Sequence, residues 1–298
     1  MEAGGRVRTP AFAGTFYPAD AAECMRLAES FVKPRPELAD VARQKRWIGG
    51  IVPHAGWVCS ASIAGHTIST LAISAGRVDV VVVFGAVHSP RSLERAALDS
   101  HAAWQTPGTE SALPVELERK LVESGESFVV DESFHEREHA VEVELPLIHA
   151  AFGNVIVLPI EVPLIDAAVE IGKATAIELA AANLKAVFLA SSDLTHYGPA
   201  YRFAPAGIGS HGLQWALGND RRLLDHVVRF EAEDVVAEVR RQANACGGGA
   251  IAAMMAACRE YGASGGAVLS HANSYQTLAN VAPQAPDNAV GYAAVVIG

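Results

Sequence analysis

The sequence predicts an α/β fold with a largely parallel or mixed central sheet and helices on both of its faces. Three observations lead to this expectation. Six short segments have the apolar, β-branched composition of strands, several of them are apolar at nearly every position, and segments with helical spacing lie between most of them. Strands that are apolar throughout are buried on both sides, as they are when helices cover both faces of a parallel sheet.

The predicted elements follow one another along the whole chain. The strands are expected at residues 47–52, 78–85, 154–160, 185–190, 267–270 and 289–297. Apolar residues recur with a helical period at residues 21–32, 58–74, 114–124, 139–151, 165–183, 212–228 and 249–261. Residues 89–104 show neither period, so no element is predicted there.

The length and composition favour one large domain. The 298 residues contain no internal repeat, no low-complexity tract and no Pro- or Gly-rich linker. Half of the residues are apolar, which is enough to bury a sizeable core. We therefore predict a single domain that spans residues 1–298.

Charge and hydropathy exclude several partners. The net charge of -10 repels phosphate backbones, and no basic cluster offsets it, so nucleic acid is not an expected partner. The N-terminus lacks the apolar core of a secretory signal, and apolar runs such as residues 80–87 are too short to span a bilayer. The four cysteines show neither CxxC pairs nor the density of a disulfide scaffold, so we expect a cytoplasmic protein without a membrane partner.

Polar side chains follow three of the predicted strands. His54 lies in PHAGW, His88 lies in AVHSP, and Asp193 and His196 lie in SSDLTHYG. Open α/β sheets bind ligands at the carboxyl ends of their strands. A histidine at a strand end is commonly a hydrogen-bonded structural residue, but three such ends together favour a site for iron, copper or zinc, because imidazole binds these metals.

Cys246 is the cysteine whose surroundings indicate a function. It precedes three glycines and an apolar helical run, which places its sulfur near a helix N-terminus. The helix dipole and free N–H groups there should lower the pKa of the thiol and favour the thiolate, which binds metals and attacks electrophiles. A tight turn in which the cysteine only fills space is the alternative. Cys24, Cys59 and Cys258 fall within helical patterns and are expected to pack in the core.

A third group of candidates would contact a ligand. His139 and Glu142 are three residues apart, so they share one helical face if the predicted helix begins at His139. The alternative is a solvated first helical turn, where acidic residues are favoured in any case. Together with Trp57 of the PHAGW segment, we predict His139 and Glu142 as substrate-binding residues.

These segments together resemble the Memo family, also called the B protein of the AmmeMemoRadiSam group. The matching stretches run in family order over nearly the whole chain: RTPAFAGTFYP, IVPHAGW, GAVHS, WQTPGT, REHAVEVELP, SSDLTHYG, ACGGGAI, HANSY and VGYAA. The chain departs from many relatives at Ser89, where they carry a second histidine, and at Cys59, where they carry an aromatic residue.

The resemblance implies a fold similar to that of the LigB-like class III extradiol dioxygenases. It also implies that His54, His88 and Cys246 occupy the positions of the metal ligands, where the ring-cleaving enzymes use a glutamate in place of the cysteine. Asp193 and His196 then match residues that line the same pocket, and His196 resembles the acid/base histidine of the dioxygenases.

Three functions remain as hypotheses. The first is a metal-dependent, dioxygenase-like oxidoreductase with Asp193 and His196 as catalytic residues and copper or iron as cofactor, zinc being the further alternative. A thiolate ligand favours copper or zinc over iron(II). The second is a protein that binds a small molecule or peptide in the same pocket without catalysis. The third is a metal-free hydrolase with Cys246 as nucleophile and His196 as base.

Overall fold

Strands and helices alternate along most of the chain. The computed structural model describes residues 5–283 and 285–298, so residues 1–4 and 284 of the predicted domain lie outside the described part. The strands are β1 (Val7–Arg8), β2 (Gly49–Val52), β3 (Val80–Gly85), β4 (Ala96–Leu98), β5 (Ala103–Thr106), β6 (Thr109–Ala112), β7 (Phe128–Val130), β8 (Ile156–Glu161), β9 (Ala186–Ser191), β10 (His196–Tyr197), β11 (Gly266–Asn273) and β12 (Ala289–Ile297).

The helices vary from single turns to five turns. The α-helices are α1 (Ala21–Phe31), α2 (Ala39–Gln44), α3 (Trp57–Ala75), α4 (Val115–Glu123), α5 (Leu145–Phe152), α6 (Ala168–Ala181), α7 (Ser210–Val228), α8 (Ala232–Gln242), α9 (Gly248–Glu260) and α10 (Ser274–Thr277). Short 3-10 helices occupy Pro36–Leu38, Glu132–Phe134, Glu142–Glu144 and Pro199–Tyr201.

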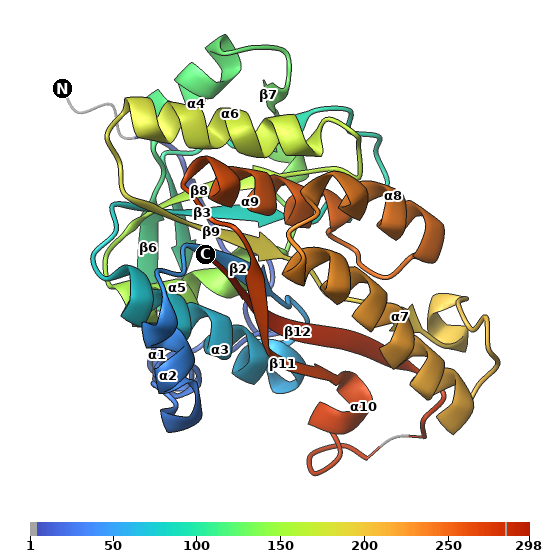
Figure 1. Cartoon of the computed structure of the whole chain (residues 1–298). Coiled ribbons are helices and arrows are strands. Elements are labelled where there is room, and N and C mark those ends of the chain that lie inside the picture. The colour runs from blue at the N-terminus through green and yellow to red at the C-terminus, as the bar shows by residue number, and fades with distance from the viewer. Residues whose placement is uncertain (1–4, 284) are drawn as a thin grey trace.

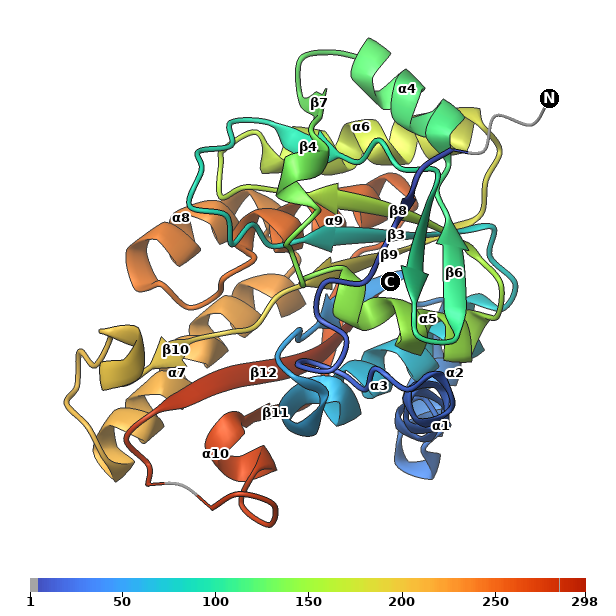
Figure 2. The same ribbon diagram turned by 180° about the vertical axis from the view of Figure 1, so that it is seen from behind.

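The central sheet is mixed, as the sequence predicts. Among the described residues its strands lie in the order β10-β12-β2-β9-β3-β8-β4-β7, and β11 pairs with β12. The four inner strands β2, β9, β3 and β8 are parallel neighbours, whereas β12 and β4 flank them in antiparallel orientation. Helices α6 and α9 cover one face, and α3, α5 and the β5–β6 hairpin cover the other (Figures 1 and 2).

The apolar strands divide their side chains between two cores. In β3, Val80, Val82 and Phe84 belong to the core beneath α6, α8 and α9. The alternate residues Val81 and Val83 belong to the core beneath α1, α3 and α5. Successive strand residues point to opposite faces, so a strand buried on both sides has to be apolar at every position.

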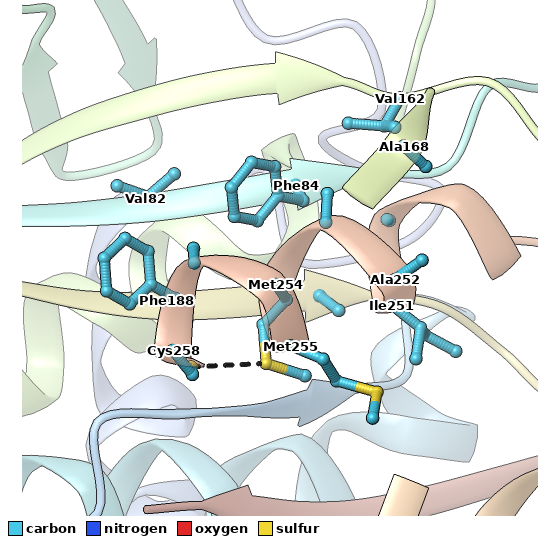
Figure 3. Close-up of a cluster of buried hydrophobic side chains, with 14 of the residues drawn as sticks. Val82, Phe84, Val162, Ala168, Phe188, Ile251, Ala252, Met254, Met255 and Cys258 are labelled. Carbon is cyan, nitrogen blue, oxygen red and sulfur yellow. Dashed lines mark hydrogen bonds between the residues drawn. The ribbon is translucent and has the colours of Figure 1, made fainter. Parts of the chain in front are cut away.

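Helix α9 lies directly on the first of these cores. Figure 3 shows Met254 and Cys258 of this helix beside Phe188 of β9. Cys258 is fully buried, and its Sγ lies 3.7 Å from the Met254 Sδ. The expectation that Cys258 packs in the core is confirmed.

The sequence located the inner elements better than the outer ones. All six predicted strands and all seven predicted helices are present, with shifts at their ends of a few residues except at the start of α5. The elements without a prediction are the short strands β1, β4, β5, β6, β7 and β10 and the helices α2, α8 and α10. The amphipathic spacing of α8, whose valines face the core, was a signal that the prediction missed. Strand β4 has only three residues, too few to display a period.

The helix predicted from residue 139 begins later than expected. Helix α5 begins at Leu145, after a 3-10 turn at Glu142–Glu144, and Pro146 lies in its first turn. Proline has no N–H to donate and is accommodated only at the start of a helix, so Pro146 delays that start. His139 and Glu142 therefore do not share a face of an α-helix.

Helix α3 is long and apolar enough to cross a membrane by length and composition alone. Polar residues such as His66 and Thr67 interrupt its apolar runs, so no uninterrupted run reveals this property in the sequence. The helix packs on β2 and β12, and 56% of its most apolar stretch is buried inside the fold. The core helices of globular proteins have the same properties, so we interpret α3 as a core helix.

Two glycines in helices offer a test of how closely α6 and α9 pack. A Cβ on Gly172 of α6 would lie 1.9 Å from the carbonyl oxygen of Ala253 in α9. Gly172→Ala should therefore destabilise the protein by about 1–3 kcal/mol through overpacking, although alanine is the better helix former. Urea unfolding monitored by circular dichroism measures the change.

The matched control is Gly218→Ala in α7, where an added Cβ meets no atom within 4 Å. This substitution should stabilise the protein by about 0.5–1 kcal/mol, because alanine lowers the entropy cost of forming the helix. If both substitutions changed the free energy of unfolding equally, helices α6 and α9 would have to move apart at Gly172 with little cost.

Candidate metal centre

The parallel strands bring the predicted metal ligands to one edge of the sheet. His54 follows the end of β2 by two residues, His88 follows β3 by three, and Cys246 lies two residues before α9. One nitrogen or sulfur atom from each of these three residues lies within 4.8 Å of the others. The structure thus gathers the three residues from positions up to 192 apart in the sequence.

Hydrogen bonds indicate which ring nitrogen of His54 is free for a ligand. The Ser191 hydroxyl donates to the carbonyl oxygen of Ala140 at 2.5 Å and lies 2.8 Å from the His54 Nδ1. A hydroxyl has one proton, so Ser191 accepts the Nδ1–H of His54. The lone pair is then on Nε2, which lies 3.2 Å from the Cys246 Sγ. Burial, followed by the nearby His139 and His88, lowers the pKa of His54 well below its ordinary value, so the ring is neutral.

His88 is oriented by a carboxylate that the sequence did not single out. Its Nδ1 lies 2.8 Å from Glu138 Oε1, and its backbone N–H donates to Oε2 at 2.7 Å. Burial lowers the pKa of His88, but hydrogen bonds with Cys246 and Glu138 outweigh this effect and raise it to about 11. Histidine ligands in metalloproteins are commonly held by such a carboxylate. His88 is therefore protonated at neutral pH in the metal-free protein, and its Nε2 would become available to a metal only on loss of that proton.

Glu138 is buried, and N–H groups surround its carboxylate. Besides His88, the backbone N–H groups of His139 and Ala140 donate to Oε1, at 2.8 and 3.1 Å. Burial alone would raise the pKa of Glu138, but the hydrogen bonds from His139 and His88 lower it below its ordinary value. Its position 50 residues from His88 gives no periodic signal, so only the folded chain reveals this contact.

Asp193 joins the loops that carry two of the candidate ligands. Its Oδ1 accepts the backbone N–H of His54 at 2.9 Å, and its carbonyl oxygen accepts the backbone N–H of Cys246 at 3.2 Å. Burial raises the pKa of the Asp193 carboxyl to about 7. These contacts give Asp193 a positioning role, and its predicted catalytic role stays a prediction.

Cys246 lies just outside the helix that the sequence predicts after it. Helix α9 begins at Gly248 with Gly247 as its N-cap, and a Cβ on Gly247 would lie 2.7 Å from that of Ser192. The expectation of a lowered pKa is wrong for the metal-free protein. Burial raises the pKa of the Cys246 thiol and outweighs the opposing hydrogen bond with His88. Removal of the thiolate from water raises its free energy by more than the N–H groups at the helix N-terminus lower it.

His139 lies against the ligand cluster, whereas Glu142 faces away from it to the N-terminal segment. The ring of His139 stacks on that of His88 with centroids 4.6 Å apart, and it lies 5.1 Å from the ring of His54. The carboxylate of Glu142 instead accepts hydrogen bonds from Arg8, from the backbone of residues 11 and 12, and from Tyr17. Glu142 therefore anchors the N-terminal segment of the chain.

Trp57 is also held by the protein itself. It is buried at the start of α3, and its indole N–H donates to the carbonyl oxygen of Val143 at 3.0 Å. The ring nevertheless forms part of the wall of two surface cavities of about 490 and 540 Å³. A ligand could contact the indole face there, but its polar atom is already engaged.

His196 lies on the short edge strand β10, with its ring 5.0 Å from that of Tyr201. Burial, followed by His88, lowers the pKa of His196 below its ordinary value. The imidazole is therefore neutral at neutral pH and is able to accept a proton. Its assignment as the acid/base residue stays a prediction.

Comparison with known proteins agrees with the motifs. The family model described as Memo-like protein matches residues 8–296. The chain belongs to the Memo family. It is similar to MEMO1 family proteins of Methanosarcina acetivorans, at 32% identity over 98% of this chain and 99% of the relative, and of Ignicoccus hospitalis, at 32% identity over 97% and 98%. A MEMO1 family protein of Thermococcus onnurineus is 28% identical over 97% of this chain.

Proposed function

We propose that this Memo family protein is a metal-dependent oxidoreductase whose metal is held by His54, His88 and Cys246. The observation that carries the proposal is the convergence of two imidazoles and one thiol within 4.8 Å. Ligands of a single tetrahedral ion lie about 3.3–3.8 Å from one another, so small side-chain movements would suffice. Ser191 and Glu138 bind the Nδ1 atoms of the two rings, and the other nitrogen of His54 faces the Cys246 Sγ.

The donor set favours copper, with zinc and iron as alternatives. A thiolate is softer than the carboxylate of a two-histidine iron site, and three protein ligands leave a position open for water or substrate. When bound, such a metal would supply Lewis acidity and, for copper or iron, electron transfer. Its coordination would require Cys246 and His88 each to lose a proton, because thiolate and neutral imidazole are the forms that bind metals.

The other residues of the site would bind substrate and move a proton. His139 forms an aromatic wall beside His88, Asp193 keeps the loops of His54 and Cys246 together, and His196 accepts a proton at its ring. A positioned histidine typically accelerates proton transfer by about 10²- to 10⁴-fold. The substrate class that fits is a small redox-active molecule or dioxygen.

Elemental analysis of protein prepared without oxygen tests the proposal. We expect about one copper, iron or zinc ion per chain in the wild type and loss of that ion in His54→Ala. Metal-free protein with an alkylation-sensitive Cys246 would instead favour a cysteine hydrolase. The histidine next to the thiol is then His54, whose Nε2 lies 3.2 Å from the Cys246 Sγ, in place of the base His196 that the sequence suggested.

His196→Ala should leave the metal content near that of the wild type while turnover falls by about 10²- to 10⁴-fold. The reason is that a residue that transfers protons need not be a ligand. Dioxygen uptake by copper-loaded protein with a catechol measures turnover, and His211→Ala, at an exposed histidine of α7, is the control. Loss of metal from the His196 variant would make His196 a ligand and contradict this role.

A second candidate function is ligand binding without catalysis. It is favoured by the two cavities that share Phe31, Trp57 and Val58, because together they form an extended, largely apolar surface. The candidate metal ligands do not line these cavities, so the ligand would bind beside the predicted pocket and not in it. A small molecule or peptide is the expected occupant. Peptide binding that is unchanged by metal removal, in a protein without turnover, would support this candidate over the oxidoreductase.

A further inference from the structure

A cavity of about 430 Å³ lies beneath α4, at the edge of the sheet formed by β4 and β7. Figure 2 shows α4 beside these two strands. The walls of the cavity come from Asp99, Ser100 and Val130 at the strand ends, and from Val115, Glu118, Arg119, Val122 and Glu123 of α4. Its volume is within the range of small-molecule sites. None of the candidate metal ligands lines it.

Glu118 is the polar residue in this cavity that lacks a partner. The residue is only 4% exposed, and its Oε1 atom is buried without a hydrogen bond from any described residue. A buried carboxyl oxygen without a partner is costly, and native proteins leave few of them. The cavity beside it offers room for the missing partner.

The neighbouring charges determine which partner fits. Asp99 is a buried residue of the same cavity wall, and Trp104 and His101 donate to its carboxylate. The guanidinium of Arg119 is engaged by the carboxylates of Glu116 and Glu123 on the same helix. When Glu118 is ionised, three carboxylates of the cavity wall, those of Asp99, Glu118 and Glu123, face the single guanidinium of Arg119, and a cation would balance the excess negative charge.

The remaining walls are apolar and open to solvent. Val115, Val122 and Val130 are 56%, 38% and 47% exposed. Valines that are this exposed around one cavity offer an apolar surface for the body of a ligand. The ligand that matches both features has a cationic head and a hydrocarbon chain.

We propose that this cavity is a binding site for a small organic cation of the primary alkylammonium type. Its ammonium group would donate to the Glu118 carboxylate, and its chain would pack on Val115, Val122 and Val130. The site is separate from the candidate metal centre, so the proposal does not depend on the proposed oxidoreductase.

The affinity for such a cation should rise with pH. Burial, and then the charge of Asp99, raise the pKa of Glu118 to about 8. Below that pH the free protein carries a neutral carboxyl, which has to lose its proton when the ammonium binds. Affinity should therefore increase from pH 6 to about pH 8 and then level off, with proton release on binding. The other charged groups that line the cavity are Asp99, Arg119 and Glu123.

Isothermal titration calorimetry of the full chain with hexylammonium chloride tests the proposal, with 1-hexanol and hexanoate as ligands of equal length. We expect one saturable site for hexylammonium and at least tenfold weaker binding of the other two. Glu118→Gln should weaken hexylammonium binding at least tenfold, because it removes a charge-assisted hydrogen bond. Glu126→Gln, at an exposed glutamate before β7, is the matched control and should change nothing.

A second variant leaves the buried residue in place. Val130→Lys puts a positive charge at the rim on an edge strand that tolerates lysine, and it should also weaken hexylammonium binding at least tenfold. Equal binding of hexylammonium and hexanol would overturn the proposal, since the cavity would then recognise only hydrocarbon. The proposal would also fail if hexylammonium did not saturate, or if it bound both variants as tightly as the wild type.

Discussion

Cys246→Ser should lower the affinity for copper or zinc at least about 100-fold, because a serine hydroxyl stays protonated at neutral pH and is a poor ligand for these metals. His54→Ala should have an effect of similar size, since it removes the ring nitrogen that lies 3.2 Å from the Cys246 Sγ. Competition with a chromophoric chelator measures both affinities. Metal should also protect Cys246 from alkylation.

Cys59→Ser is the matched control for the cysteine substitution. Cys59 is half-buried on α3 and does not belong to the ligand cluster, so its replacement should leave metal affinity unchanged. The variants and the chelated wild type should all unfold cooperatively, because the two apolar cores contain no candidate ligand. Full metal affinity in Cys246→Ser, together with equal alkylation rates of Cys246 with and without metal, would show that the thiolate is not a ligand.

Glu138→Gln should lower metal affinity by about 10- to 100-fold, the usual effect of removing a group that orients a metal-binding histidine. The carboxylate accepts N–H groups at both oxygens, from His88 on one side and from His88, His139 and Ala140 on the other. An amide has a single oxygen, so whichever way it is turned its NH₂ group would face an N–H donor. His88 would then lose its fixed orientation.

The same competition assay measures this effect, with Glu136→Gln as control. Glu136 is exposed and lies two residues before Glu138, so its substitution changes the local charge equally without touching His88. Unchanged metal affinity in Glu138→Gln would mean that His88 does not need this partner. In that case the contact between the two residues would serve only the fold.

The fold could be predicted where the apolar pattern was complete. The inner strands are apolar at nearly every position because both of their faces are buried, and this pattern requires no knowledge of their neighbours. The outer strands β4 and β7 have three residues each, and β10 has two. Segments this short carry no readable period, and their pairing is determined by the sheet that they join.

The candidate site likewise has some features that the sequence predicts and others that only the tertiary structure reveals. The sequence by itself determined the family and the places of His54, His88 and Cys246, because strand ends and a helix start are local features that residue patterns reveal. Only the tertiary structure showed that Glu138 orients His88 and that Glu142 anchors the N-terminal segment. It also decided the pKa of Cys246, since desolvation depends on everything packed around the sulfur. Such contacts join residues 50 to more than 130 positions apart, and no periodic pattern connects positions at that separation.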